Sequence, residues 1–267
     1  AVNDPKGEYG PLATAYGLTH VRLYPGGAHR LNPLDVVPGD RGAIVRERLV
    51  EAMVEVALER RLDAGEQALL GAVVTQATER IEVPVLGDIA TALSEPHGFG
   101  RRELDHLDTR ELKEMATPLR FGLGRLLDRT LRGMFDGPTS VTIDRTNSPG
   151  LVVDLSSVFD DREALPLVMM ATGAWLQNML SGLGDRRGLL VDDEVWALLA
   201  HEHTVRHLQA RLKLCRHLGI ANILVCHKLA DLRAQSDDGT AAHKVAAGLL
   251  ADASTRIVFQ QAPDQID

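Results

Sequence analysis

The chain is 267 residues long, with 45% hydrophobic residues, 4% aromatic residues and a net charge of −8 at pH 7. This composition is typical of a soluble globular protein of one large or two modest domains, and it gives no overall electrostatic signature of nucleic-acid binding. Proline, glycine and amide residues interrupt the most apolar long stretch, residues 165–183, which therefore predicts a buried helix and no membrane span. Two cysteines and no signal-like N-terminus favour a cytoplasmic protein.

The first 135 residues contain two kinds of pattern. Residues 1–40 alternate short apolar runs with Gly and Pro, which predicts the helix, strand and loop of an α/β unit. In residues 41–135, Leu49, Met53 and Val56 belong to an apolar series at helical spacing, with glutamates on another face. Three further stretches of similar texture follow, so this region is predicted to be all-α.

From residue 136 the chain returns to an α/β pattern. Residues 140–156 predict a hairpin or a pair of strands, because turn residues separate two β-branched runs. Short β-rich runs then alternate with helical stretches, which is typical of a mostly parallel sheet; these runs are 188–193, 221–227 and 255–261. We therefore expect one α/β domain formed by residues 1–40 and 136–267, with residues 41–135 as an all-α insertion.

An acidic group follows one of the predicted strands. If "GLLVD" is a buried strand, Asp193 and Glu194 emerge at its carboxyl end, where parallel sheets collect ligands. In nucleotide hydrolysis, one carboxylate at such a place holds Mg²⁺ through water and a second orients or deprotonates the attacking water. The same residues also fit the acidic first turn of a helix, with Asp192 as its cap. The local pattern leaves both interpretations open.

Other polar residues are predicted to reach the same edge of the sheet. Asp4 and Glu8 follow the first predicted strand. A later strand is followed by His227, Lys228 and Asp231, and the last one by Gln260 and Gln261. Because the carboxyl ends of parallel strands share an edge, these side chains are expected to gather around Asp193 and Glu194.

Taken in order, these motifs resemble the type IV secretion and conjugation ATPases of the HerA and FtsK superfamily of P-loop NTPases. The resemblance covers nearly the whole chain, and the segments that carry it are "DPKGEY" at 4–9, "NPLD" at 32–35, the all-α insertion, "LLVDDEVW" at 189–196, "RHLG" at 216–219 and "HKLADL" at 227–232. It implies a RecA-like P-loop NTPase core with a mostly parallel sheet plus an all-α insertion, and it implies ATP and Mg²⁺ as ligands.

The resemblance also implies roles for individual residues. Asp193 matches the Walker B aspartate that holds Mg²⁺ via water, and Glu194 matches the catalytic glutamate. Arg216 matches an arginine that reaches the nucleotide of an adjacent subunit; its position in the last turn of a helix before Gly219 fits a purely structural role equally well.

Three further residues, His227, Glu8 and Gln260, are also assigned roles, although they match the family pattern less specifically. His227 stands where relatives usually carry a glutamine that senses the γ-phosphate, so its protonation would matter near pH 7. Glu8 matches an acidic residue close to the active site, and Gln260, after the last predicted strand, is assigned to nucleotide binding.

One element of the family is missing from these residues. A phosphate-binding loop needs glycines followed by a lysine, and none of the five lysines of the chain follows a glycine. The resemblance places that loop one helix upstream of "DPKGEY", and relatives continue beyond residue 267. We therefore expect these residues to be a C-terminal motor-domain fragment of a longer ATPase, inactive by itself and without tight ATP binding.

Three functions are carried forward. The preferred one is an ATPase that couples ATP hydrolysis to type IV secretion or conjugative transfer, assembled as a homo-oligomer, with a ring as the expected form. Its expected partners are other secretion-channel subunits and a DNA or protein substrate, and its expected location is the cytoplasm or the inner face of the cell membrane. The alternatives are a DNA-translocating ATPase of the same superfamily and a non-hydrolysing assembly module.

Overall fold

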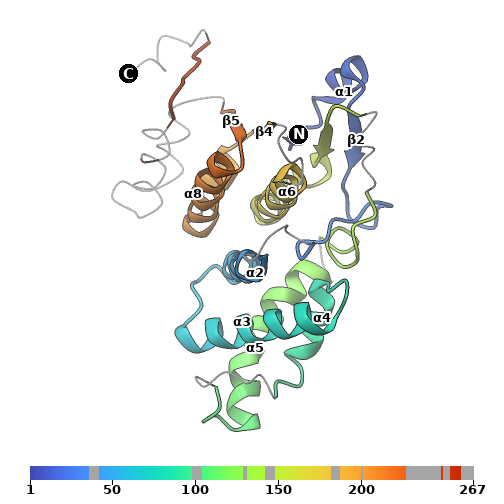
Figure 1. Ribbon diagram of the computed structural model, residues 1–267. Helices are drawn as coiled ribbons and strands as arrows, with labels where there is room; N and C mark the ends of the chain where they lie inside the picture. Colours follow the sequence, from blue (N-terminus) through green and yellow to red (C-terminus); the bar gives the residue numbers. More distant parts are fainter. Residues whose placement is uncertain are drawn as a thin grey trace.

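The computed structural model describes residues 1–35, 42–97, 104–128, 131–141, 148–181, 187–199, 201–226, 248 and 253–259. The strands of these residues form one five-stranded, all-parallel sheet in the order β2-β3-β1-β4-β5 (Figure 1). The strands are β1 (Val2–Asp4), β2 (Thr19–Arg22), β3 (Leu151–Asp154), β4 (Gly188–Asp192) and β5 (Ile220–Leu224). The predicted α/β class with a mostly parallel sheet is confirmed.

The helices α6 (Ala164–Ser181) and α8 (Glu202–His217) cover one face of this sheet, and the short α1 (Gly10–Tyr16) covers part of the other, where Leu189 of β4 and Ile223 of β5 are exposed. Alternate residues of a strand point to opposite faces, so Asn3 contacts α6, whereas Val2 packs with Ala13 of α1. The helix α8 lies beside α6 and follows the short α7 (Trp196–Leu199). The central strand β1 is therefore buried between α6 and α1.

Four helices lie between β2 and β3 in the chain. They are α2 (Gly42–Leu58), α3 (Ala64–Arg80), α4 (Leu86–Ala92) and α5 (Thr109–Leu127), and they form the lower part of the molecule in Figure 1. The predicted apolar series is confirmed, since Leu49, Met53 and Val56 of α2 are all buried. The helix α2 packs against α6 and α8 on one side and against α3 and α5 on the other, so one hydrophobic core runs through both parts.

The polar "NPLD" segment joins these parts together. Asn32 donates its side-chain amide to Pro84 O at 2.9 Å, and the carboxylate of Asp35 accepts hydrogen bonds from Thr139 Oγ1 at 2.6 Å and Trp175 Nε1 at 3.0 Å. These contacts link the helical block, the 131–141 segment and α6. They explain the segment as a structural connection within the core.

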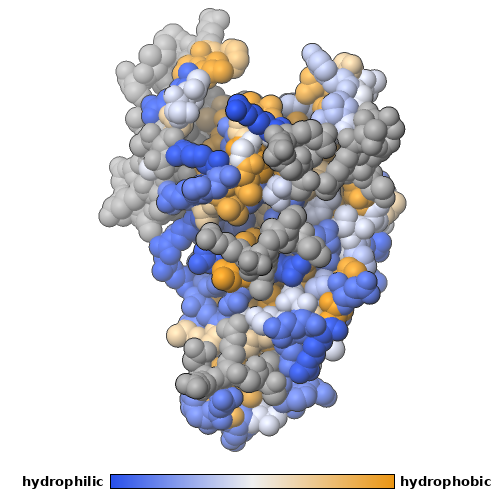
Figure 2. Space-filling view, viewed as in Figure 1, coloured by the Kyte–Doolittle hydropathy of each residue, from blue (hydrophilic) through white to orange (hydrophobic). Residues whose placement is uncertain are grey.

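The surface differs between the two parts. In Figure 2 the helical block presents mostly hydrophilic residues, and apolar residues appear in the hollow beside the strands. The helix α6 is nearly all buried, as its apolar sequence predicts, from Ala164 to Gln177. Within the described ranges, every helix is too short or too polar to cross a bilayer.

Two predictions for the strands differ from the structure. Residues 140–156 predict a hairpin or a pair of strands, and the hairpin is wrong, because β3 has parallel neighbours on both sides, β1 and β2, and no edge left for an antiparallel partner. Residues 142–147 lie outside the described part. Residues 255–259 of the predicted strand at 255–261 do not belong to the five-stranded sheet, and Ile257, Val258 and Phe259 are exposed.

Candidate active site

The carboxyl ends of β1 and β4 bring two loops together. Asn3 of β1 is in register with Asp192 of β4, although 189 residues separate them. The pairing continues past the strand, because Asp193 N donates a hydrogen bond to Asn3 O at 3.2 Å. The loop of residues 4–9 therefore lies beside residues 193–196, as expected for neighbouring parallel strands.

The 4–9 loop is folded around the carboxylate of Asp4. This side chain is fully buried and accepts hydrogen bonds from the backbone N–H groups of Gly7 at 2.8 Å, Glu8 at 3.1 Å and Tyr9 at 3.0 Å. Gly7 has a φ of +74°, and a Cβ there would lie 3.1 Å from Asp154 Oδ1, so a glycine suits both its backbone angle and its surroundings. The "DPKG" sequence thus encodes a tight turn.

Glu194 is buried, and each of its carboxylate oxygens has a partner. Lys6 Nζ lies 2.6 Å from Oε1, and Trp196 Nε1 donates to Oε2. The Glu194 side chain is 1% exposed, so these contacts replace the water that an ionised carboxylate would otherwise bind. Its backbone φ of +51° is unusual for a residue with a side chain. The hydrogen bond with Glu194 is the main reason why the pKa of Lys6 is raised.

Asp193 has its own partner in the same loop. Its Oδ1 accepts a hydrogen bond from Glu194 N at 2.8 Å, and the hydroxyl of Tyr9 is hydrogen-bonded to its carboxylate. Burial is the largest cause of a rise in the pKa of Tyr9 to about 12, and the negative charge of Asp193 adds to it. Tyr9 therefore remains protonated at neutral pH and can donate a hydrogen bond to Asp193.

Asp192, the first of the three carboxylates, points to the other face of the sheet. Its carboxylate forms a buried ion pair with Arg211 of α8, in which Arg211 Nη1 lies 3.3 Å from Oδ1, and it also accepts from Asn3 Nδ2 at 3.2 Å. Both side chains are almost completely buried. Asp192 therefore anchors α8 to the sheet, and the predicted alternative role as a helix cap does not apply to it.

Arg216 lies away from the carboxylate pair. It is exposed in the last turn of α8, three residues before Gly219, and β5 begins directly after that glycine, at Ile220. This is the amino edge of the sheet, whereas Asp193 and Glu194 lie at the carboxyl edge. The structure does not bring Arg216 to the site of its own subunit.

The remaining predicted residues divide into two groups. Glu8 is exposed in the loop that carries Lys6 and Tyr9, and its charge contributes to the raised pKa of both. His227 and Gln260 lie outside the described residues. The structure neither supports nor contradicts the sensor and nucleotide-binding roles expected of those two.

Two residues of this site had not been assigned roles from the sequence, namely Lys6 and Tyr9. Both belong to the "DPKGEY" segment, so the signal that could have found them is the same motif that identifies the loop. Only the β1–β4 pairing shows which carboxylate each one contacts.

The carboxylates of this site supply only part of the ligand shell of a metal ion. Among the described residues there is no group of three or more His, Cys, Asp or Glu side chains placed to hold a metal. Asp193 fits a Mg²⁺ ion that is held through water and completes its shell with phosphate oxygens, since that arrangement needs one or two protein carboxylates. The assignment of Mg²⁺ to Asp193 stays a prediction.

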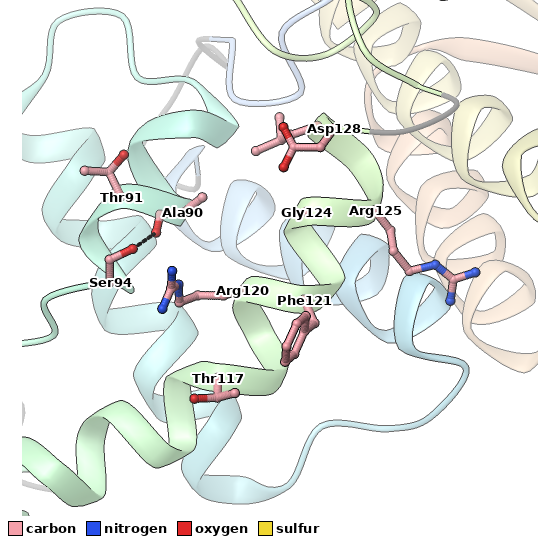
Figure 3. Close-up of a pocket in the computed structure, with 10 residues that line it drawn as sticks. Ala90, Thr91, Ser94, Thr117, Arg120, Phe121, Gly124, Arg125 and Asp128 are labelled. Carbon is pink, nitrogen blue, oxygen red and sulfur yellow. Dashed lines mark hydrogen bonds between the residues drawn. The ribbon is translucent and has the colours of Figure 1, made fainter.

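A separate open groove of about 770 Å³ lies between α4 and α5 (Figure 3). Its lining includes Phe121, which is 70% exposed, together with Arg120 and Ser94, whose hydroxyl donates to Ala90 O at 3.1 Å. The residues that line this groove belong to the helical block and include none of the carboxylate pair or its partners. We therefore do not assign the hydrolytic chemistry to it.

Comparisons with known proteins support the fold. Neither protein-family models nor curated protein sequences gave a match. Among solved structures, VirB4 of Thermoanaerobacter pseudethanolicus matches with a TM-score of 0.69 and 18% identity over 93% of this chain. The bacterial conjugative coupling protein TrwB matches with a TM-score of 0.56 and 16% identity over 94% of it. The same plasmid coupling protein in complex with a non-hydrolysable GTP analogue matches with a TM-score of 0.51 and 18% identity.

The chain spans 66% of the VirB4 chain and 65% of the first TrwB chain. At these identities the likeness establishes the fold and leaves activity to be argued from the site. The RecA-like α/β architecture that the sequence resemblance implies is thus found in the structure, and the chain has the fold of the secretion and conjugation proteins VirB4 and TrwB.

Proposed function

We propose that this chain is the C-terminal part of the motor domain of an ATPase that couples ATP hydrolysis to type IV secretion or conjugative transfer. The observation that carries the proposal is the carboxylate pair at the end of β4. Asp193 and Glu194 are both buried there, and each has a partner from the loop after β1. The likeness to VirB4 and TrwB supports the same assignment.

In this proposal the two carboxylates have different roles. Glu194 orients the attacking water and accepts its proton, while Asp193 holds the metal through water. Mg²⁺, when bound, supplies positive charge that neutralises the phosphate oxygens. Tyr9 keeps the Asp193 carboxylate oriented by hydrogen bonding, and the buried Asp192–Arg211 pair holds the end of β4 against α8.

The assembly is part of the proposal. Arg216 is exposed at the sheet edge opposite to Glu194, which supports a role at the nucleotide of a neighbouring copy in a homo-oligomeric ring. Other subunits of a secretion channel are the proposed partners, and DNA or a protein is the proposed cargo. The proposed place of action is the cytoplasmic side of the cell membrane.

The test compares two substitutions in the full-length parent protein. Glu194→Gln is expected to leave Mg-ATP binding nearly unchanged while it lowers kcat by about a hundredfold or more, because water activation is lost and the phosphate contacts remain. Asp193→Asn is expected to weaken Mg²⁺-dependent binding as well as turnover. Glu114→Gln, an exposed glutamate on α5, is the matched control and should leave both unchanged. Unchanged turnover in Glu194→Gln would remove Glu194 from the mechanism.

A DNA-translocating ATPase is the second candidate, and the likeness to a plasmid coupling protein supports it. It is distinguished by direct binding of DNA that weakens steeply with added salt, because phosphate contacts release counterions. Binding of DNA without that salt dependence, or no binding, would leave the secretion ATPase as the better assignment. A wild-type parent that assembles but does not hydrolyse ATP would identify a non-hydrolysing assembly module.

A further inference from the structure

We propose that Lys6 is a positioning residue that aims the Glu194 carboxylate at the reaction site. The catalytic role of Glu194 in this inference is taken from the proposed function. The contact between Lys6 and Glu194 is given by the structure and does not depend on that function. Lys6 Nζ lies 2.6 Å from Glu194 Oε1, and the carboxylate it contacts is 1% exposed.

The burial of Glu194 distinguishes this pair from an ordinary surface ion pair. An exposed pair contributes little, because water competes with each partner. Removing one partner of a buried pair leaves an uncompensated charge, which either moves or reorganises its surroundings. Glu194 therefore depends on Lys6 for its orientation, whereas the ammonium of Lys6, with 27% of the side chain exposed, remains in contact with solvent.

The backbone at Glu194 adds a second reason why its side chain needs a fixed partner. Its φ of +51° lies in the left-handed region, which costs of order 1 kcal/mol or more for a residue with a side chain and persists only where the surroundings hold it. Glu194 N donates to Asp193 Oδ1 at 2.8 Å, and Lys6 and Trp196 contact the two carboxylate oxygens, so this residue is held at its backbone and at its side chain. Without Lys6, Oε1 loses its charged partner, and the orientation of the carboxylate is expected to change.

Lys6 is itself held in place by its loop. The backbone on both sides of it is fixed by the buried Asp4, which accepts hydrogen bonds from Gly7 N, Glu8 N and Tyr9 N. The ammonium also lies 5.6 Å from the centre of the Phe159 ring, a cation–π contact. Lys6 is therefore fixed well enough to orient a partner, and its position does not depend on Glu194 alone.

The kinetic test uses Lys6→Met in the full-length parent. We expect kcat to fall about tenfold or more while KM for ATP changes less than about threefold, because a misplaced base slows the chemical step and leaves nucleotide contacts intact. Lys6→Arg keeps a cation at this place and is expected to retain most of the activity. Lys113→Met, an exposed lysine on α5, is the matched control for the same substitution.

A double-mutant cycle separates positioning from a direct role in catalysis. If Lys6 acts through Glu194, Lys6→Met has no further effect on the residual hydrolysis of Glu194→Gln, and the two losses are not additive. Additive losses would show that Lys6 acts on the nucleotide or on folding by another route and would overturn the proposal. An increase in kcat in Lys6→Met would also overturn it, because Lys6 would then restrain Glu194.

The third test does not need ATP hydrolysis. Trp196, whose indole contacts Glu194, is the reporter in a parent protein in which Trp175 and every tryptophan outside these 267 residues are replaced by Phe. Lys6→Met is expected to shift the fluorescence emission of Trp196, while Lys6→Arg and Lys113→Met leave it unchanged. In the Glu194→Gln background, Lys6→Met is expected to give no further shift. Circular dichroism checks that each variant is folded, and Lys6→Gln replaces Lys6→Met if the latter does not fold.

These results distinguish the two proposals. An unchanged Trp196 spectrum in folded Lys6→Met means that Lys6 does not position Glu194, whatever the ATPase activity. A shifted spectrum in a parent protein that does not hydrolyse ATP means that the positioning contact is real and that the proposed function is wrong.

Discussion

Glu194 and Arg216 lie at opposite edges of the parallel sheet. Glu194 follows the carboxyl end of β4, whereas Arg216 precedes the amino end of β5, the strand that pairs with β4 from Gly188↔Ile220 to Asp192↔Leu224. With a rise of about 3.3 Å per residue, the length of these strands separates the two residues by well over 10 Å. If both groups act on one γ-phosphate, as proposed, they must therefore come from different subunits.

The first prediction concerns this separation. In the full-length parent, Arg216→Ala and Glu194→Gln are each expected to lose most of the ATPase activity, and a mixture of the two variants is expected to recover part of it. Recovery occurs because some interfaces pair an intact arginine with an intact glutamate. The measurement is steady-state hydrolysis, with mixed oligomers verified by two different affinity tags. A mixture that assembles and stays inactive would assign Arg216 to the helix end alone.

The second prediction concerns Tyr9, the partner of Asp193. Tyr9→Phe removes the hydroxyl that is hydrogen-bonded to this carboxylate. Losing one hydrogen bond of about 1 kcal/mol is expected to weaken Mg²⁺-dependent nucleotide binding roughly fivefold in the parent, with a smaller effect on kcat. Tyr16→Phe, at a tyrosine that is 68% exposed, is the control for calorimetric titration with Mg-ATP. Equal affinities in all three proteins would show that Tyr9 does not orient Asp193.

The third prediction concerns the close packing of Gly173 on Arg211. A Cβ at Gly173 would lie 2.0 Å from Arg211 Nη1, so Gly173→Ala must displace the guanidinium from Asp192. Breaking a buried ion pair costs about 3–5 kcal/mol, and urea unfolding should show a loss of that order.

The matched control for that substitution is Gly124→Ala in α5. An added Cβ there would meet its nearest atom, Asp128 Oδ2, at 3.8 Å, which is ordinary contact. The higher helix propensity of alanine should leave the protein equally stable or more stable by up to about 1 kcal/mol. Equal effects of the two substitutions would mean that the Gly173 site can relax around a methyl group.

The fourth prediction concerns the pH dependence of stability. Burial, and next the positive charge of Arg211, lower the pKa of His207 to about 3, from an ordinary value of 6.5. Because the unfolded chain then binds a proton at higher pH than the folded chain, the contribution of His207 to stability is complete above pH 6.5. It falls by about 1.4 kcal/mol per pH unit between pH 6.5 and pH 3.

Urea unfolding at pH 7 and pH 5 measures this effect. The wild-type chain should lose more stability between these two values than His207→Gln, which cannot be protonated there. His217→Gln, at an exposed histidine in the last turn of α8, should behave like the wild type. If all three proteins lose the same stability, His207 is not kept neutral by the fold.

The sequence predicts the acidic end of β4 well because the signal is local. A short apolar run followed directly by Asp193 and Glu194 identifies both the strand and its carboxyl end, and the parallel sheet then predicts where ligands collect. The contacts of Lys6 and Tyr9 could not be predicted in this way. They depend on which strand lies next to β4, and the neighbour is β1, from the far end of the chain.

The errors have a similar origin. A turn-rich stretch before Leu151–Asp154 has the local pattern of a hairpin, yet β1 and β2 take both edges of β3. Residues 255–259 have the β-branched and aromatic composition of a strand, but they do not belong to the sheet. In both cases the pattern is local, whereas the pairing that decides the structure is non-local.

The three-residue strand β1 also has a consequence for the order of folding. Val2 pairs with Val152 on one side and with Val191 on the other, so neither neighbour is close in sequence, whereas α2, α3, α4 and α5 pack mainly on one another. Closing such long loops lowers the conformational entropy of the chain before the strand contacts can form. Local helical contacts are therefore expected to form faster. The helical block is therefore expected to form early, and Glu194 meets Lys6 only when the centre of the sheet closes. We therefore expect the contact between Lys6 and Glu194 to be among the last to form during folding.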